Sequence, residues 1–193
     1  MSKPKIGIII GSTRKGRLAD TVLEWIEGLA GERADLGFVR VDLRDYPLPL
    51  YDEGIAPIYQ PAANAVASRL SATMEALDGY IFLVAEYNHA PTGALKNAID
   101  HLFPELGRKP ASFVGYGGVG GARAVEQLRL ILIELRVAPL RDAVHVGLAE
   151  LKGVQDGKGF SDYEYLTASA HAMLEELAWW THVLSDARRG PGQ

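Results

Sequence analysis

The segment GSTRKGR, residues 11–17, places hydroxyl and cationic side chains directly after a run of apolar residues. Its polar members are Ser12, Thr13, Arg14, Lys15 and Arg17. Gly11 allows a sharp turn, and a helix that starts near Leu18 would direct free backbone amides and the positive end of its dipole at the loop. These donors together suit the oxygens of a terminal phosphate. The alternative is a turn with solvated cations, and no Walker phosphate-binding motif occurs.

A second polar cluster, EYNHAPTG at residues 86–93, also follows an apolar run. It joins an acid, an aromatic, an amide and an imidazole, namely Glu86, Tyr87, Asn88 and His89. Thr92 has a side chain that can cap a following helix. No second histidine or carboxylate stands at metal-ligand spacing from His89, so we expect a surface histidine and no metal site.

The third unusual loop is GYGGVGG, residues 115–121, in which Gly115, Gly117 and Gly120 fit the spacing G-x-G-x-x-G. A dinucleotide fingerprint belongs on the first strand of its unit, with an acid about 20 residues later on the next strand. Here the match follows a later strand, and Glu134 falls inside an expected helix. We therefore interpret the loop as a glycine-rich wall whose backbone can approach a flat ring closely.

Strand-like and helix-like segments alternate along the chain and position these three loops. We expect strands at residues 4–10, 38–43, 79–85, 111–117 and 143–148, and helices around 18–29, 62–77, 92–103, 120–137 and 166–184. This alternation predicts an α/β fold, a three-layer αβα, doubly wound, five-stranded parallel sheet in the flavodoxin-like order 2-1-3-4-5. We expect a single domain over residues 1–187 and a flexible C-terminal tail at 188–193.

In such a sheet the ligand lies outside the carboxyl ends of the strands, near the point where the strand order reverses. The three loops follow the first, third and fourth expected strands, so we expect them to meet there.

Composition narrows the possible functions. The formal net charge is −4, which argues against nucleic acid as the main partner, and the absence of cysteine excludes disulfides, thiolate catalysis and Cys-ligated metals. The apolar run near the N-terminus is too short for a secretory signal, and no run reaches the length of a membrane span. We expect a cytoplasmic protein with neither nucleic-acid nor membrane partners.

Four segments together resemble the NAD(P)H-dependent FMN reductase family, a flavodoxin-like group that includes quinone and azo reductases. They are GSTRKGR (11–17), PLPLYDE (47–53), AEYNHAPTGALKNAIDHL (85–102) and GYGGVGGARAVEQLR (115–129). The resemblance covers residues 5 to about 150, and the run from Glu86 to Asp100 is its most specific part.

The resemblance implies FMN held without covalent attachment at the predicted edge. Ser12, Thr13, Arg14 and Arg17 would bind its phosphate, Glu86, Tyr87 and Asn88 would line the isoalloxazine, and Gly117, Gly118 and Val119 would flank the ring from the other side. Leu18 and Ala85 complete the set, and both stand where the family often has other residues. The implied reaction is ping-pong: hydride passes from NADPH or NADH to flavin N5, and electrons then pass to a flavin, quinone or similar small-molecule acceptor.

No side chain has the features of a nucleophile or a general acid–base pair, and a flavin enzyme needs none because the cofactor supplies the chemistry. We therefore assign no catalytic residue. The alternative function is a flavodoxin-type FMN electron carrier without nicotinamide activity, and a flavin-free regulatory domain is a third possibility. The cations of residues 11–17 and the modest net charge favour the enzyme.

The segment LRLILIEL, residues 128–135, is apolar on nearly every side of its expected helix. One alternative is deep burial under the last helix, and the other, which we favour, is a contact in a homodimer or homotetramer. We expect Trp179 and Trp180 to lie in the core and at the edge of the closing helix.

Overall fold

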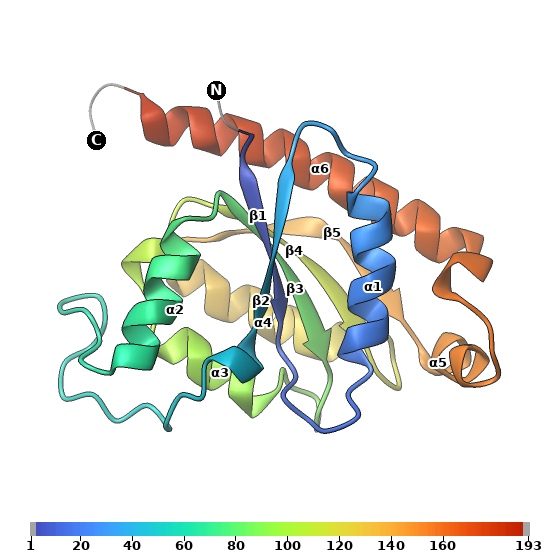
Figure 1. Cartoon of the computed structure of the whole chain (residues 1–193), viewed down its shortest axis with the longest axis horizontal. Coiled ribbons are helices and arrows are strands. Elements are labelled where there is room, and N and C mark those ends of the chain that lie inside the picture. The colour runs from blue at the N-terminus through green and yellow to red at the C-terminus, as the bar shows by residue number, and fades with distance from the viewer. Residues whose placement is uncertain (1–2, 191–193) are drawn as a thin grey trace.

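The computed structural model describes residues 3–190 and contains a five-stranded parallel sheet covered by helices on both faces (Figure 1). The strands are β1 (Lys5–Ile10), β2 (Gly37–Asp42), β3 (Gly79–Ala85), β4 (Pro110–Tyr116) and β5 (Ala138–Val146). They are ordered β2-β1-β3-β4-β5 with parallel pairing throughout, which confirms the predicted flavodoxin-like fold.

The α-helices are α1 (Ala19–Ala30), α2 (Ala65–Glu75), α3 (Gly93–Asp100), α4 (Ala122–Glu134), α5 (Leu148–Gln155) and α6 (Glu164–Arg189). Short 3₁₀ turns lie at Leu43–Asp45, Pro104–Leu106 and Phe160–Asp162. No helix within residues 3–190 is both long and apolar enough to cross a bilayer.

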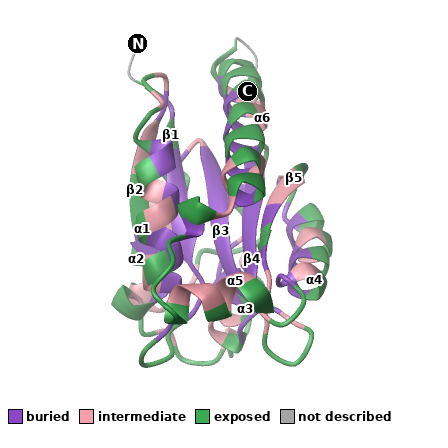
Figure 2. Cartoon of the chain, turned by 90° about the vertical axis from the view of Figure 1, so that its right-hand side faces the viewer, coloured by how far each residue is buried: buried purple, intermediate pink, exposed green. Residues whose placement is uncertain are grey.

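Alternating side chains of each central strand enter two separate cores. Ile8 of β1 packs on the side of α1 and α6, whereas its neighbour Ile9 packs on the side of α2, α3 and α4. Every residue of β3 and β4 is buried (Figure 2), because helices cover both faces of these strands. This layering explains the continuous apolar runs in the sequence.

Local capping chemistry explains where α2 and α3 begin. The side chain of Asn64 accepts hydrogen bonds from the amides of Val66 and Ala67, so α2 begins at Ala65. Thr92 caps α3 in the same way by accepting from the amide of Leu95 at 3.1 Å, as predicted from the sequence.

Three expected boundaries were wrong. β5 begins at Ala138 rather than residue 143, because this edge strand is buried on one face only and its polar residues Arg141 and Asp142 hide the pattern. Residues 148–155 form the unexpected helix α5. α6 continues through Arg189, and Arg188 within the expected tail binds Asp78 at 2.8 Å, while residues 191–193 lie outside the described part.

The apolar segment 128–135 lies in α4, which packs on the opposite sheet face from α6. Burial under the last helix, one of the two expectations, is therefore wrong. Leu128 and Leu132 face the sheet, whereas Leu130 and Ile133 are 71% and 58% exposed. On α6, Trp180 packs partly against the core and Trp179 is exposed.

Candidate functional site

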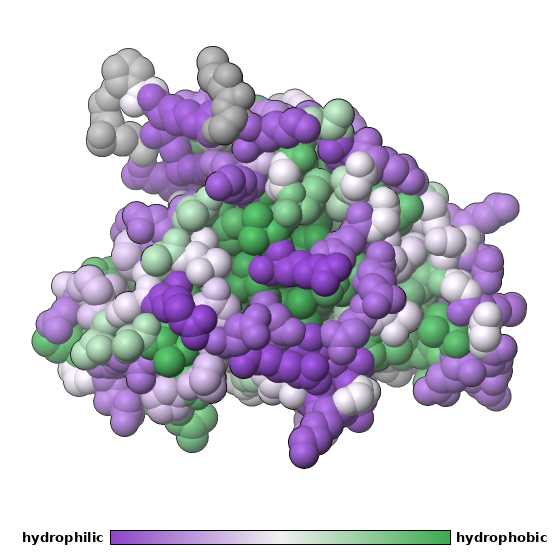
Figure 3. Space-filling model, viewed as in Figure 1, coloured by the Kyte–Doolittle hydropathy of each residue, from purple (hydrophilic) through white to green (hydrophobic). Residues whose placement is uncertain are grey.

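Three loops meet at the carboxyl edge of the sheet, at the bottom of the view in Figure 1. Their strands β1, β3 and β4 are adjacent, so parallel pairing brings the loops together. The amide of Gly11 donates to the carbonyl of Leu83 at 3.3 Å, and the amide of Glu86 donates to the carbonyl of Tyr116 at 3.1 Å. In the same orientation the surface along this edge is hydrophilic, below an apolar area over β2 (Figure 3).

The loop after β1 contains all of the expected phosphate donors. Thr13, Arg14, Lys15 and Gly16 are exposed, and Gly16 adopts a φ of +60° with no atom within 4 Å of an added Cβ. Within the described chain, none of the backbone amides of residues 12–17 donates a hydrogen bond. A loop of free amides preceding a helix is a ready anion-binding arrangement.

Ser12 is 1% exposed, and its hydroxyl lies 3.1 Å from that of Tyr87. This bond joins the loop after β1 to the loop after β3. Thr92 adds a second link by donating its hydroxyl to the carbonyl of Gly11.

Arg17 is buried rather than free. Its guanidinium binds Asp20 at 2.6 Å and Asp42 at 2.5 Å, and these carboxylates raise the already high pKa of Arg17. Burial alone would raise the pKa of Asp42, but the bonds from Arg17 and from the amide of Arg44 lower it below its usual range. Leu18, the next expected contact, is half-buried at the start of α1.

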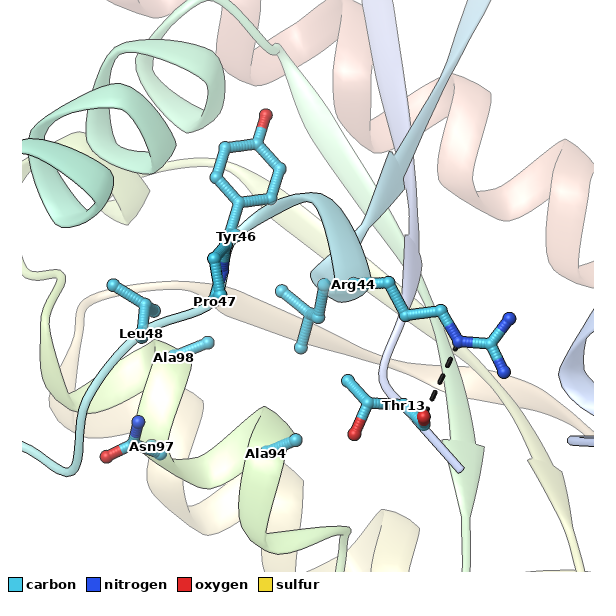
Figure 4. Close-up of a pocket in the computed structure, with 9 residues that line it drawn as sticks. Thr13, Arg44, Tyr46, Pro47, Leu48, Ala94, Asn97 and Ala98 are labelled. Carbon is cyan, nitrogen blue, oxygen red and sulfur yellow. Dashed lines mark hydrogen bonds between the residues drawn. The ribbon is translucent and has the colours of Figure 1, made fainter. Parts of the chain in front are cut away.

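Sequence reasoning missed Arg44, which is in the 3₁₀ turn after β2. It reaches across to the loop after β1 and donates to the carbonyl of Thr13 (Figure 4) and to that of Arg14. The rule that directed attention to the ends of β1, β3 and β4 applies equally to β2 and could have found it.

Arg44 and Thr13 also line a pocket of about 340 Å³ between the segment 43–48 and α3 (Figure 4). Its remaining walls are mainly apolar, from Leu43, Tyr46, Pro47, Leu48, Ala94, Asn97 and Ala98. Asn97 fixes the rim, because its side chain accepts from the amide of Tyr51 and donates to the carbonyl of Pro49.

The loop after β3 is a tight two-residue hairpin. Tyr87 and Ala90 exchange backbone hydrogen bonds of 2.9 and 3.0 Å, and Asn88 and His89 between them have φ values of +50° and +68°. Asparagine tolerates the left-handed region better than most residues, which explains its place here. The turn exposes Tyr87, Asn88 and His89, while Ala85 stays buried at the end of β3.

α4 anchors this hairpin. Arg123 Nε donates to Glu86 Oε1 at 2.6 Å, its Nη1 lies 2.8 Å from His89 Nε2, and Gln127 donates to the carbonyl of His89. Burial would raise the pKa of Glu86, but Arg123 outweighs that effect and lowers it. Glu86 is thus held ionised, and its second oxygen is buried with no partner among the described residues.

The glycines after β4 divide into two groups. A Cβ on Gly121 would lie 2.5 Å from the amide nitrogen of Tyr116, and one on Gly115 would lie 2.7 Å from the carbonyl oxygen of Gly120. These positions pack α4 against β4. Gly118 has open space, and Val119 beside it is 51% exposed.

Gly117 approaches the hairpin closely, because a Cβ there would lie 3.1 Å from Cβ of Glu86. His145 of β5 fixes the other end of the segment through Nδ1, which lies 2.9 Å from the carbonyl of Gly120. The exposed wall is therefore Gly118 and Val119, with Gly117 at its base. Within residues 3–190, no group of three or more acidic or histidine side chains could hold a metal ion.

The fold and the site define a flavodoxin-like α/β protein whose carboxyl edge offers a loop of free backbone amides beside a glycine-rich wall. The chain belongs to the NADPH-dependent FMN reductase family, whose model matches residues 4–150. This match confirms the family resemblance predicted from the sequence.

Individual relatives agree with this assignment. The chain is 35% identical over 149 residues to an NAD(P)H-dependent FMN reductase of Schizosaccharomyces pombe, covering 73% of this chain and 72% of that protein. It is 30% identical over 139 residues to the quinone reductase of Escherichia coli, covering 69% and 71%. FerB, a flavoenzyme NAD(P)H:(acceptor) oxidoreductase from Paracoccus denitrificans, superposes with a TM-score of 0.65 over 93% of this chain and 97% of that chain; at 22% identity it supports the fold alone.

Proposed function

We propose that this protein is an NAD(P)H-dependent FMN reductase that passes electrons to a flavin, a quinone or a similar small acceptor. Membership of the family makes the chain an oxidoreductase that works with FMN and NAD(P)H. The observation that carries the proposal is the loop of free amides at residues 12–17, which lies at the edge where a flavodoxin-like sheet binds its ligand.

The residues present fit FMN. The amides of residues 13–15 would hold the phosphate, with the hydroxyl of Thr13 and the guanidinium of Arg14 as additional donors. Glu86, Tyr87 and Asn88 would line one side of the ring, and Gly117, Gly118 and Val119 the other. Ser12, Arg17, Leu18 and Ala85 would shape the site from below, since Ser12, Arg17 and Ala85 are buried and Leu18 is half-buried.

FMN, when bound, supplies the redox chemistry by accepting a hydride from NAD(P)H and giving two electrons to the acceptor in a separate half-reaction. The chain's own residues would bind FMN, orient its ring and enclose it. Glu86 is held ionised by Arg123 and therefore cannot serve as a proton donor at neutral pH. No single side chain is expected to be indispensable for hydride transfer.

The proposal is tested by mixing purified protein with FMN, desalting it, and adding NADPH or NADH without oxygen. Retained yellow colour that bleaches within seconds supports the reductase, and the faster nucleotide identifies the donor. Retained colour that does not bleach would instead support the flavodoxin-type electron carrier. The exposed cations Arg14 and Lys15 favour the reductase, because they suit an anionic nucleotide substrate.

The apolar face of α4 supports a homo-oligomer. Leu130 and Ile133 are exposed on a helix whose opposite side is fully packed. We propose that a second copy of the chain covers this face, in a dimer or a tetramer. Light scattering at micromolar concentration tests this, and a monomer would refute it.

A further inference from the structure

Two arginines hold the backbone carbonyls of the loop after β1. Arg17 Nη1 donates to the carbonyl of Ser12 at 2.7 Å. Arg44 donates through Nε to the carbonyl of Thr13 at 3.4 Å and through Nη2 to that of Arg14 at 2.5 Å. Three successive carbonyls therefore face guanidinium groups.

Peptide geometry fixes where the amides point. In a trans peptide the C=O and the following N–H point in opposite directions, and the described chain contains no cis bond. The carbonyls of residues 12–14 face the arginines, so the amides of Thr13, Arg14 and Lys15 face away from them. These amides are among those with no partner in the described chain, and successive free amides in one concavity bind anions.

Asp42 anchors both arginines. It accepts from Arg17 through both oxygens, at 2.7 and 2.5 Å, and from the backbone amide of Arg44 at 3.0 Å. Asp20 pairs with Arg17 as well and lies 3.9 Å from Arg44 Nη1. Two carboxylates thus balance two guanidiniums, and Arg17 has little free charge to offer a phosphate.

We propose that Arg17 and Arg44, anchored by Asp42, are positioning residues that hold the loop with its amides turned toward the phosphate of FMN. The proposal rests on the proposed function, because it assigns FMN to this edge. Under this proposal Arg17 does not contact the phosphate. It binds the carbonyl of Ser12 on the side of the loop opposite the free amides. Because FMN and riboflavin differ only by this phosphate, a change in the loop should affect binding of FMN and not of riboflavin.

The sharpest test is Asp42→Asn, because direct phosphate contact by the arginines and positioning of the loop predict different effects on the affinity for FMN. If Arg17 or Arg44 touched the phosphate, removing a nearby negative charge would leave FMN binding unchanged or make it tighter. If the arginines position the loop, loss of their anchor weakens FMN binding. Kd is measured for FMN and for riboflavin by quenching of flavin fluorescence, and riboflavin separates phosphate binding from general loss of structure.

We expect Asp42→Asn to raise the Kd for FMN roughly tenfold and to leave the Kd for riboflavin unchanged. Arg44→Ala should act the same way, and because its side chain is 38% exposed the variant should fold. Arg44→Lys should restore part of the affinity, since an ammonium can hold one carbonyl. Arg40→Ala is the matched control, because Arg40 lies on β2 with Asp42 and, among the described residues, its guanidinium binds only Glu27.

Three results would overturn the proposal: unchanged or tighter FMN binding by Asp42→Asn, unchanged binding by Arg44→Ala, or equal weakening for FMN and riboflavin. Failure of the proposed function looks different, because the wild-type protein would then either retain no FMN or hold FMN that NADPH and NADH do not bleach.

Discussion

A Cβ added at Gly121 would come closer to backbone atoms than one at any other glycine of the candidate site, so replacing Gly121 with alanine should destabilise the fold severely. Its φ of +68° costs a non-glycine residue about 1–2 kcal/mol. The new Cβ would also lie 2.5 Å from the nitrogen of Tyr116 and 2.8 Å from the carbonyl carbon of Gly115. Both are backbone atoms that cannot rotate away, and such overpacking costs about 1–3 kcal/mol. The sum is about 2–5 kcal/mol, a large part of the roughly 5–15 kcal/mol that stabilises a domain.

Urea unfolding measures this effect. With a slope of about 2 kcal/mol per molar, the midpoint of Gly121→Ala should fall by roughly 1–2.5 M. Gly118→Ala in the same loop is the control, because an added Cβ there meets nothing within 4 Å, and it should leave the midpoint within experimental error. Equal midpoints for the two variants would show that close packing of α4 against β4 is not why position 121 holds glycine.

Three other changes test separate parts of the structure. Asn88→Ala should lower the free energy of unfolding by about 1 kcal/mol, because alanine is disfavoured at a φ of +50°, whereas Asn88→Gly should be nearly neutral. Thermal unfolding compares the two variants. Equal losses would show that the positive φ of Asn88 does not decide which residue is favoured there. Burial, reinforced by the charge of a nearby arginine, lowers the pKa of Lys109 to about 8. Between pH 8 and 10 the unfolded chain therefore binds more protons than the folded chain, and the free energy of unfolding of the wild type should rise with pH by roughly 2–3 kcal/mol relative to Lys109→Met. A difference between the two proteins that stays constant with pH in urea unfolding would refute this. Replacing both Leu130 and Ile133 with Glu should reduce the molar mass measured by light scattering, while the free energy of unfolding changes by only about 0.5 kcal/mol. Glu134→Lys on the same helix is the control and should keep the oligomer. An unchanged molar mass in the double variant would place the interface elsewhere.

The sequence was informative where the physical cause is local. β3 was predicted to the residue, because both of its faces are buried and its apolar run has sharp ends. Thr92 was predicted as a cap, because the capping bond joins residues three apart. β5 was misplaced, because an edge strand buried on one face has no continuous apolar run to mark its start.

The sequence by itself determined the fold class, the strand order and the three loops that form the candidate site, since apolar runs, periodicity and the parallel-sheet rule suffice for these. Only the tertiary structure decided what each cation does. In the chain, Arg14 and Arg17 are two similar side chains of one loop, yet one is exposed and the other is buried between two carboxylates. Asp42 ends β2 and Arg44 follows it, far along the sequence from the loop after β1, and parallel pairing of β1 with β2 brings both residues to that loop. The contacts of Arg17 and Arg44 with Asp42 and with the loop carbonyls depend on this long-range geometry, which no local pattern encodes.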